Sequence, residues 1–176
     1  SYLRQIIKEN LQVNVTLKQV NTYAEFLTLE DKVRFETYFN TKVVELYQAS
    51  EGQMASPCKE GHLHINEDLV YVELYDKEGN PINEPGVIGH EMIITNLINT
   101  VQPLIRYKMN DMIVLDDKCP CGSSFRRIKH VLGRHDDLIQ AKDQAGSIKV
   151  IYPDMFARWI ITESDKISEF KVTQKA

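Results

Sequence analysis

Cysteine and histidine side chains that can bind a metal ion stand at two separate places in the chain. Cys119 and Cys121 are one residue apart, and Cys58 is followed closely by His62 and His64. Thiolates and imidazoles are the usual ligands of tetrahedral zinc sites. Most zinc modules hold their ligands closer together in sequence than Cys58 and Cys119, so three free thiols are the alternative to a metal site.

Basic residues follow the second of these cysteine groups. Arg126, Arg127 and Lys129 lie just beyond it, as in a zinc module that grips nucleic acid. The chain as a whole has a formal net charge of -4 and a pI near 5.7, so attraction to phosphate is not a property of its entire surface. We therefore favour a solvated strand face over a nucleic-acid patch, and we expect His130 and His135 at the surface.

An aromatic ring, a hydroxyl and a carboxylate occur together in the segment YQASEG, residues 47 to 52. The segment ends a predicted strand, which is where α/β sheets bind ligands. Tyr47 can stack on a base, Ser50 can donate to a phosphate oxygen and Glu51 can hold Mg²⁺. Taken alone, the segment is more typical of a strand end with a solvated glutamate.

Two further polar segments are PLIRYKMND (103 to 111) and GRHDD (133 to 137). An aspartate such as Asp111 near a strand end can accept hydrogen bonds from both hydroxyls of a ribose. A salt bridge on the rim of a barrel explains Arg106 and Asp111 equally well. The segment GRHDD is also consistent with a plain polar loop between domains.

The composition is that of a globular protein. Of the 176 residues, 43% are hydrophobic, which is enough for a core. No window approaches the ~18 consecutive apolar residues of a membrane span, and the first residues lack the order of a signal peptide. We expect no membrane association and a cytoplasmic location. Three cysteines in a chain of this length do not make a disulfide framework.

Hydrophobic periodicity predicts an α/β layer in the first part of the chain. We expect one helix from Ser1 to about Leu11 and a second at 29 to 39, where acidic residues favour the helix N-terminus. Alternation predicts a strand at 13 to 17, and the apolar run at 43 to 47 predicts another.

The character of the sequence changes from residue 62 onward. Short strands at close spacing predict an antiparallel sheet or barrel, and their expected positions are 69 to 75, 91 to 97, 103 to 107 and 111 to 115. A small domain is predicted beyond GRHDD, with a hairpin turning at 143 to 146, a helix opened by Pro153 and a last strand at 169 to 174.

Together these segments resemble the adenylate-forming enzymes, in particular the phenylacetate-coenzyme A ligase-like branch. Four motifs match in family order: YQASEG the aromatic-x-x-Thr/Ser-Glu motif, GHEMIITNL the Gly-Glu-strand element, PLIRYKMND the Arg-Tyr-Arg-Thr-Gly-Asp motif, and GRHDD the Gly-Arg-x-Asp-Asp motif. The resemblance implies that a carboxylic acid attacks the α-phosphate of ATP to form an acyl-adenylate. A thiol, usually coenzyme A, then displaces AMP.

The resemblance also implies a role for each matching residue. The implied contacts are Tyr47 with adenine, Ser50 with the α-phosphate, Glu51 with Mg²⁺, Asp111 with the ribose, and Arg134 with ribose and phosphate, while Asp136 is the implied hinge of the small domain. Glu51 and Arg134 would act in catalysis. Phosphoryl chemistry needs alignment and charge neutralisation more than a protein nucleophile, and these residues provide both.

Members of the branch often carry a similar Cys-x-Cys-Gly segment and a histidine that matches His64. With this resemblance we expect a structural zinc ion bound by Cys58, His64, Cys119 and Cys121 rather than three buried thiols. We expect His62 to be a solvated neighbour, because His64 lies in the alternation of the strand that follows.

The sequence departs from the family pattern at several positions. Gln48 replaces a usual glycine, and Lys-Met-Asn replaces Arg-Thr-Gly before Asp111. The family's phosphate-binding loop is expected upstream and its catalytic lysine downstream, and neither matches a segment of the chain. We therefore expect a C-terminal fragment that is inactive alone.

The expected fold is α/β with a β-barrel-like subdomain and part of a small α+β C-terminal domain. Residues 1–56 would end the large AMP-binding subdomain, residues 57–133 would form the barrel with its zinc site, and residues 134–176 would hold the hinge and the truncated small domain.

Three functional hypotheses follow. The first is an ATP-dependent ligase that joins a small-molecule carboxylic acid to coenzyme A or another thiol acceptor. The second is a zinc-pinned nucleic-acid-binding module, although we expect no nucleic acid as a partner. The third is a catalytically inactive homologue that acts as a scaffold. The sequence leaves open whether the protein is a homodimer and which acid is activated.

Overall fold

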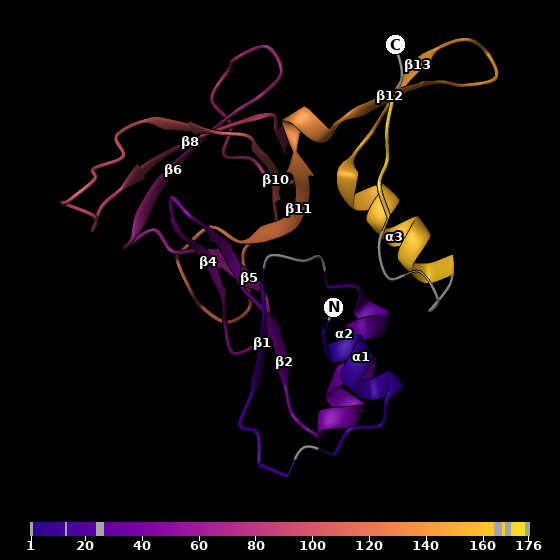
Figure 1. The fold of residues 1–176 in the computed structure, drawn as a ribbon. Coiled ribbons are helices and arrows are strands. Elements are labelled where there is room, and N and C mark those ends of the chain that lie inside the picture. The colour runs from indigo at the N-terminus through magenta and orange to yellow at the C-terminus, as the bar shows by residue number, and fades with distance from the viewer. Residues whose placement is uncertain (1, 13, 24–26, 164–166, 168–169, 175–176) are drawn as a thin grey trace.

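The computed structural model describes the chain except residues 1, 13, 24–26, 164–166, 168–169 and 175–176. A small α/β layer comes first (Figure 1), and it consists of α1 (Tyr2–Lys8), β1 (Val20–Thr22), α2 (Leu29–Phe39) and β2 (Val43–Glu45). The two strands pair in parallel. The predicted helix at 29 to 39 is confirmed, and the first helix ends earlier than expected.

Local signals set both ends of α2. The buried Thr28 Oγ1 accepts a hydrogen bond of 3.0 Å from the backbone N–H of Asp31, which is an N-cap interaction. Asn40 then adopts a left-handed conformation with φ of 46° and ends the helix. The guanidinium of Arg4 in α1 bonds to the Asp31 carboxylate with an Nε–Oδ1 distance of 3.0 Å, so the two helices are tied together.

The middle of the chain forms antiparallel strands in three sheets. The strands are β3 (Tyr47–Ala49), β4 (Gly52–Pro57), β5 (Leu63–Ile65), β6 (Val70–Tyr75), β7 (Ile88–Gly89), β8 (Glu91–Asn96), β9 (Tyr107–Met109), β10 (Asp111–Leu115) and β11 (Ile128–Arg134). Their orders are β3-β4-β5, β6-β8-β9 and β11-β10-β7. A bridge between His64 and Arg127 links the first sheet to the third. The expected antiparallel, barrel-like subdomain is confirmed.

Alternating side chains of these strands fill one core. Val70, Val72 and Leu74 of β6 are buried, and Met92 and Ile94 of β8 are fully buried beside them. Alternation puts every second residue of a strand on one face of the sheet. Each such side chain contributes about 1.5–3 kcal/mol by leaving water, so this core fixes the frame on which the loops of the candidate sites lie.

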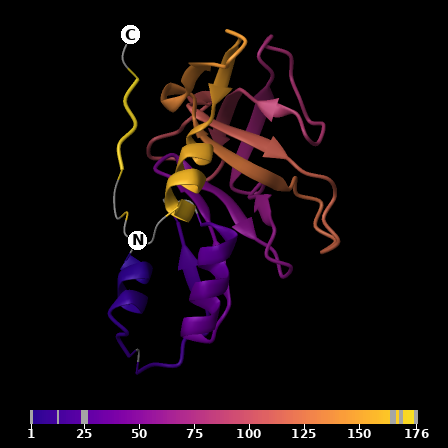
Figure 2. The same cartoon turned by 90° about the vertical axis from the view of Figure 1, so that its right-hand side faces the viewer.

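A smaller unit follows β11. The 3-10 turn η1 (His135–Asp137) leads into β12 (Ile139–Lys142) and β13 (Ile148–Ile151), which pair antiparallel, and then into α3 (Pro153–Glu163). The predicted hairpin and the helix opened by Pro153 are confirmed. α3 lies beside β11 (Figures 1 and 2). A Cβ added to Gly133 would lie 2.9 Å from Pro153 Cβ, so glycine is required where the helix meets the strand.

The predicted strand at 103 to 107 is wrong for most of its length. Arg106 has a positive φ of 50°, and its backbone N–H donates to the side-chain Oγ1 of Thr95 at 3.1 Å rather than to a backbone carbonyl. The neighbouring strand β9 begins only at Tyr107. A hydrogen bond to a side chain takes the place of a backbone hydrogen bond between strands at this position.

The strands expected at 13 to 17 and at 169 to 174 are also wrong for the residues that the structure describes. Residues 14–17 and 170–174 form no strand, and residues 13 and 169 lie outside the described part. In the first layer, β2 pairs instead with Val20–Thr22. None of the helices in the described ranges has the length and apolar character needed to cross a bilayer.

Candidate functional site

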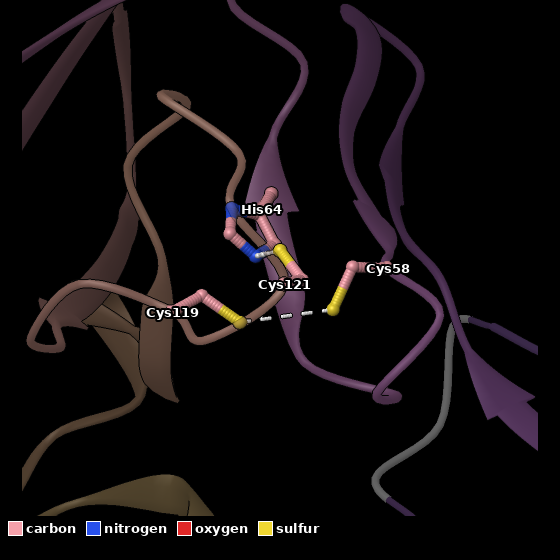
Figure 3. A group of neighbouring side chains, drawn as sticks. All are labelled: Cys58, His64, Cys119 and Cys121. Atoms are coloured by element: carbon pink, nitrogen blue, oxygen red, sulfur yellow. Dashed lines mark hydrogen bonds between the residues drawn. The ribbon is translucent and has the colours of Figure 1, made fainter.

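Four possible metal ligands come together at one edge of the barrel. One ligand atom from each of Cys58, His64, Cys119 and Cys121 lies within 4.8 Å of all the others, and Figure 3 shows the four side chains pointing toward one another. Cys58 follows β4 and His64 lies on β5, whereas both other cysteines lie in the loop between β10 and β11. The fold therefore joins two segments that are far apart in sequence.

Two distances within this cluster are close to those of a tetrahedral zinc site. Cys58 Sγ lies 3.8 Å from Cys119 Sγ, and Cys121 Sγ lies 3.5 Å from His64 Nε2. Zinc bonds of usual length at the tetrahedral angle would separate two sulfur ligands by about 3.8 Å, and a sulfur from a nitrogen by about 3.6 Å. The donor set and its spacing fit the ion.

The buried His64 ring is oriented for metal binding. Its Nδ1 lies 2.8 Å from the carbonyl oxygen of Phe125, and a carbonyl only accepts, so Nδ1 carries the proton. The lone pair is then on Nε2, which faces Cys121. A backbone carbonyl that fixes the tautomer in this way is typical of the outer shell of a metal site.

His62 is closer to the cluster than the sequence suggested. Its Nδ1 lies 3.3 Å from Cys119 Sγ, and its side chain is half-buried rather than fully solvated. From this position it can donate a hydrogen bond to a Cys119 thiolate. The four-atom group is completed by His64 and not by His62, as expected.

The local environment shifts the pKa values of Cys58 and Cys119 in opposite directions. Burial acts to raise the pKa of Cys58, but hydrogen bonds with the backbone of His62 and Glu60 and with the other two thiols lower this pKa to about 6. Burial raises the pKa of Cys119. Cys58 therefore ionises before Cys119, which supplies one thiolate near neutral pH.

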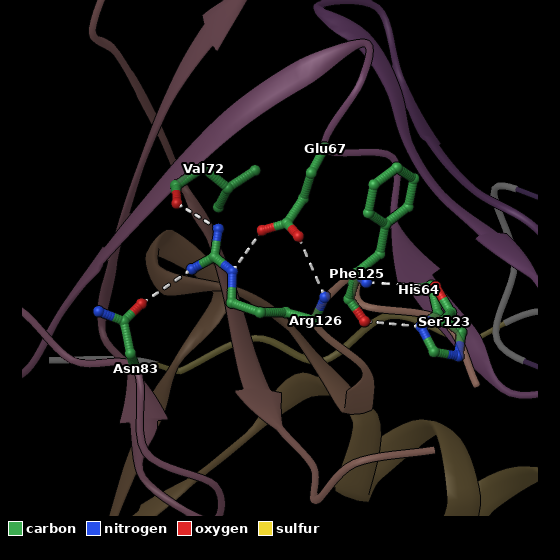
Figure 4. Close-up of polar contacts among 7 residues, drawn as sticks. All are labelled: His64, Glu67, Val72, Asn83, Ser123, Phe125 and Arg126. Atoms are coloured by element: carbon green, nitrogen blue, oxygen red, sulfur yellow. Dashed lines mark hydrogen bonds and ion pairs between the residues drawn. The ribbon is translucent and has the colours of Figure 1, made fainter. Parts of the chain in front are cut away.

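The Arg126 clamp, defined as Arg126 with Glu67, Val72 and Asn83, holds the chain next to this cluster (Figure 4). Arg126 Nε donates to Glu67 Oε1 at 2.6 Å, Nη2 donates to the Val72 carbonyl at 2.6 Å, and Nη1 donates to Asn83 Oδ1 at 3.1 Å. The carbonyl that orients His64 belongs to the residue before Arg126. The clamp thus positions the backbone on which the histidine depends.

The interpretation of the basic run as a solvated strand face is wrong for its two arginines. Both are half-buried. Arg126 lies in the clamp, and Arg127 Nη2 lies 2.7 Å from Asp116 Oδ2. Of the run, Lys129 is exposed. The guanidinium groups on which the nucleic-acid hypothesis rested are engaged within the barrel.

Tyr47 and Asp111, which the sequence predicted to contact adenine and ribose, form a hydrogen bond with each other. Tyr47 on β3 donates a hydrogen bond of 2.7 Å to Asp111 Oδ2 at the start of β10. Burial, the charge of Asp111 and the charge of Glu51 raise the pKa of Tyr47 well above its ordinary value. The phenol therefore stays protonated and donates, and the Glu51 carboxylate is close enough to act on it.

The remaining predicted residues lie around this pair. Ser50 and Glu51 form the turn between β3 and β4, where Ser50 is exposed and Glu51 is half-buried. Arg134 is exposed and stands opposite Asp111 in the β10–β11 register. The alternative salt bridge between Arg106 and Asp111 is not formed, since Arg106 pairs with Glu73 at 2.5 Å.

Asp136 lies in η1 and is held by a residue that the sequence did not single out for a role. Asn110 Nδ2 donates to Asp136 Oδ2 at 2.7 Å, and the carbonyl of Asn110 accepts from the backbone N–H of His135 at 2.7 Å. Asn110 stands where the family pattern has glycine. That departure was the only sequence signal for it.

The chain is similar in sequence to curated proteins. No family model matches the chain. The chain is 30% identical over 144 residues to Protein CapK of Staphylococcus aureus, and the match covers 80% of this chain and 30% of CapK. It is 36% identical over 78 residues to a phenylacetate-coenzyme A ligase of Thermus thermophilus, which covers 43% of this chain and 17% of that ligase.

Solved structures match over most of the chain. The open conformation of 2-hydroxyisobutyryl-CoA ligase in complex with 2-HIB-AMP and CoA matches 92% of this chain with a TM-score of 0.69 and 21% identity. A benzoate CoA ligase from Burkholderia xenovorans LB400 matches 95% with a TM-score of 0.55 and 16% identity. The chain thus shows the resemblance to the adenylate-forming enzymes that its sequence predicted. Its fold is part of the adenylate-forming ligase fold, as the four motifs predicted.

The chain spans only part of the length of its relatives. It covers 30% of CapK and 17% of the Thermus ligase, and 39% and 43% of the two solved ligases.

Proposed function

We propose that this chain is part of an ATP-dependent acid–thiol ligase of the phenylacetate-coenzyme A ligase-like branch. Such an enzyme forms an acyl-adenylate from a carboxylic acid and ATP and passes the acyl group to a thiol such as coenzyme A. The hydrogen bond between Tyr47 and Asp111 is the observation that carries the proposal. It brings together an aromatic ring for a base and a carboxylate for a ribose from strands that are far apart in sequence.

The residues around this pair suit the reaction. Glu51 offers a hard oxygen donor beside the pair, which fits Mg²⁺. When bound, Mg²⁺ would neutralise phosphate charge. Ser50 precedes Glu51 in the turn, Arg134 stands opposite Asp111, and both are exposed, so a hydroxyl donor and a cation are available to align and stabilise a phosphate. The acid and the second substrate would be small molecules.

We further propose that Cys58, His64, Cys119 and Cys121 hold a structural zinc ion. Their four ligand atoms leave no open position for a substrate, which is typical of structural rather than catalytic zinc. The ion would supply a cross-link between the turn after β4 and the loop before β11. The fixed tautomer of His64 and the low pKa of Cys58 support binding at neutral pH.

The domain limits proposed from the sequence divide the chain at residues 56/57 and 133/134. Gly133, with φ of +97° and its close approach to Pro153, supports a boundary at the second position. The cytoplasmic location is also kept as a proposal.

Nucleotide binding by the 176-residue chain tests the first proposal. AMP should perturb the NMR signals of residues 47–51 and 111, with weak affinity. Asp111→Ala should weaken this binding by about tenfold, because the ribose loses a charged acceptor. Asp117→Ala removes an exposed carboxylate just beyond β10 and is the matched control.

The chemical step is tested in the complete gene product by exchange of labelled pyrophosphate into ATP in the presence of candidate acids. Glu51→Gln should depress turnover more than ATP binding, since it loosens Mg²⁺. AMP binding without exchange would favour an inactive homologue. Tight, salt-sensitive DNA binding without nucleotide binding would overturn the ligase proposal in favour of the nucleic-acid module.

A further inference from the structure

Asn110 lies between the candidate nucleotide residues and the hinge. Its side-chain amide donates to the Asp136 carboxylate at 2.7 Å, and its carbonyl accepts from the His135 N–H at 2.7 Å. The next residue, Asp111, accepts from Tyr47 and pairs in register with Arg134. One dipeptide therefore contacts both Tyr47 of the candidate nucleotide site and the turn η1.

The two hydrogen bonds of Asn110 differ in whether they depend on the conformation of η1. The backbone bond to His135 continues the ladder between β10 and β11, and any residue at position 110 would retain it. The side-chain bond is different, because Asp136 lies in η1, beyond the last residue of β11. A rotation about the N–Cα bond of Asp136 swings its carboxylate away from Asn110, so a rearrangement of the turn through this torsion must break the hydrogen bond.

The chemistry of the pair gives the bond a direction. A carboxylate accepts only, so the amide nitrogen of Asn110 must be the donor. A hydrogen bond to a charged group is stronger than one between neutral groups, although exposure weakens it. We expect this hydrogen bond to shift the ratio of the observed to the rearranged conformation of η1 by about fivefold.

We propose that Asn110 is a positioning residue that holds Asp136 and biases the hinge toward the observed conformation. Through Asp111, the same dipeptide couples the hinge to the nucleotide. This coupling rests on the proposed nucleotide function, whereas the hold on Asp136 does not. In the family pattern a glycine at this position has no side chain with which to make the bond.

Hydrogen exchange of the 176-residue chain, followed by mass spectrometry on peptides covering 134–139, tests the hold. Asn110→Ala should increase exchange in this segment by about fivefold, with β6 and β8 unchanged as a check on folding. Asn80→Ala is the matched control, because Asn80 Nδ2 donates to Asp76 Oδ2 at 3.0 Å in a distant turn. It should leave the hinge unchanged.

An exchange of the two side chains separates a specific bond from a general structural role. Asn110→Asp places two carboxylates together and should loosen the segment further than alanine. The double variant Asn110→Asp with Asp136→Asn has the wild-type net charge and reverses donor and acceptor, so it should restore slow exchange. Unchanged exchange in Asn110→Ala, or no rescue in the double variant, would overturn the hold.

Addition of AMP tests the coupling. AMP should slow hinge exchange in the wild-type chain and have less effect in Asn110→Ala at equal occupancy. Equal slowing in both chains would refute the coupling but not the hold. If AMP does not bind, the proposed function fails on its own, and the result without nucleotide still decides whether Asn110 holds Asp136.

Discussion

The phenol of Tyr47 donates a hydrogen bond of 2.7 Å to the carboxylate of Asp111, 64 positions later in the chain. The bond joins β3 to β10, and so it links two of the three barrel sheets. It satisfies one acceptor of Asp111 and leaves the other carboxylate oxygen for a ligand. The same bond therefore serves folding and the candidate ribose contact.

Tyr47→Phe should lower the free energy of unfolding at pH 7 by about 1–2 kcal/mol, because Asp111 loses a donor. Burial and then the charge of Asp111 raise the pKa of Tyr47 above 10.0. A raised folded-state pKa means that the contribution of Tyr47 is complete below about pH 10 and is lost as pH rises further. The wild type should therefore lose stability more steeply above pH 10 than the variant. Urea unfolding at several pH values measures this, and the exposed Tyr71→Phe is the control.

The chain should contain about one zinc ion after purification without added metal, and elemental analysis measures it. Removal of the ion by a strong chelator should lower the melting temperature by roughly 10 °C, because the cross-link between two distant segments is lost. Cys58→Ser combined with Cys119→Ser should abolish the effect of the chelator. A metal-free wild type whose melting does not respond to chelator would leave only free thiols.

The two histidines near the cluster should respond differently to substitution. His64→Ala should reduce zinc affinity by orders of magnitude, because the ring supplies one of the four ligands. His62→Ala should reduce it by about tenfold, as expected for an outer-shell donor to Cys119. Competition with a chromophoric chelator measures both. The reverse order would make His62 the ligand.

Gly133→Ala should destabilise the chain by roughly 2–4 kcal/mol, since a Cβ is strained at φ of +97° and would also collide with Pro153. Gly146→Ala is the matched control. Gly146 has φ of +81° with nothing within 4 Å of the added atom. Gly146→Ala should therefore lose only the stability that backbone torsional strain costs, about 1 kcal/mol. Equal losses in denaturant unfolding would show that the contact with Pro153 has no effect.

Arg126→Lys should cost about 2 kcal/mol of stability, because lysine keeps the charge but loses the planar fork that bonds to Glu67, Val72 and Asn83 together. Zinc affinity should fall as well, since the Phe125 carbonyl that orients His64 loses its anchor. Lys129→Ala, at an exposed position of β11 three residues later, should change neither quantity. Thermal melting and zinc competition test both effects.

The sequence predicted elements whose signals are local. The helix at 29 to 39 starts where Thr28, Glu30 and Asp31 stabilise its N-terminus, and β6 follows the alternation of residues 70 to 75. Both depend on neighbours within a few positions. The strand predicted at 103 to 107 failed because Arg106 takes a left-handed conformation that no local pattern requires.

Contacts between distant residues were predicted only where a motif carried them. The four possible zinc ligands were predicted from residue types and resemblance, and the structure brings them together. Glu67 was not expected to pair with Arg126, because the partner of a basic residue across 59 positions depends on the barrel register. Asn110 was noted only as a departure, since the place of Asp136 beside it follows from the turn η1.

The four-ligand cluster also bears on the order in which the chain folds. Cys58 and His64 lie before the β6-β8-β9 sheet in sequence, and Cys119 and Cys121 lie after it. A complete set of ligands exists only once that intervening sheet has brought the two segments together, and contacts of such sequence separation form slowly. The rate of metal binding during refolding would therefore report the rate at which the barrel closes. Comparison with the rate at which α2 forms would show which of the two comes first.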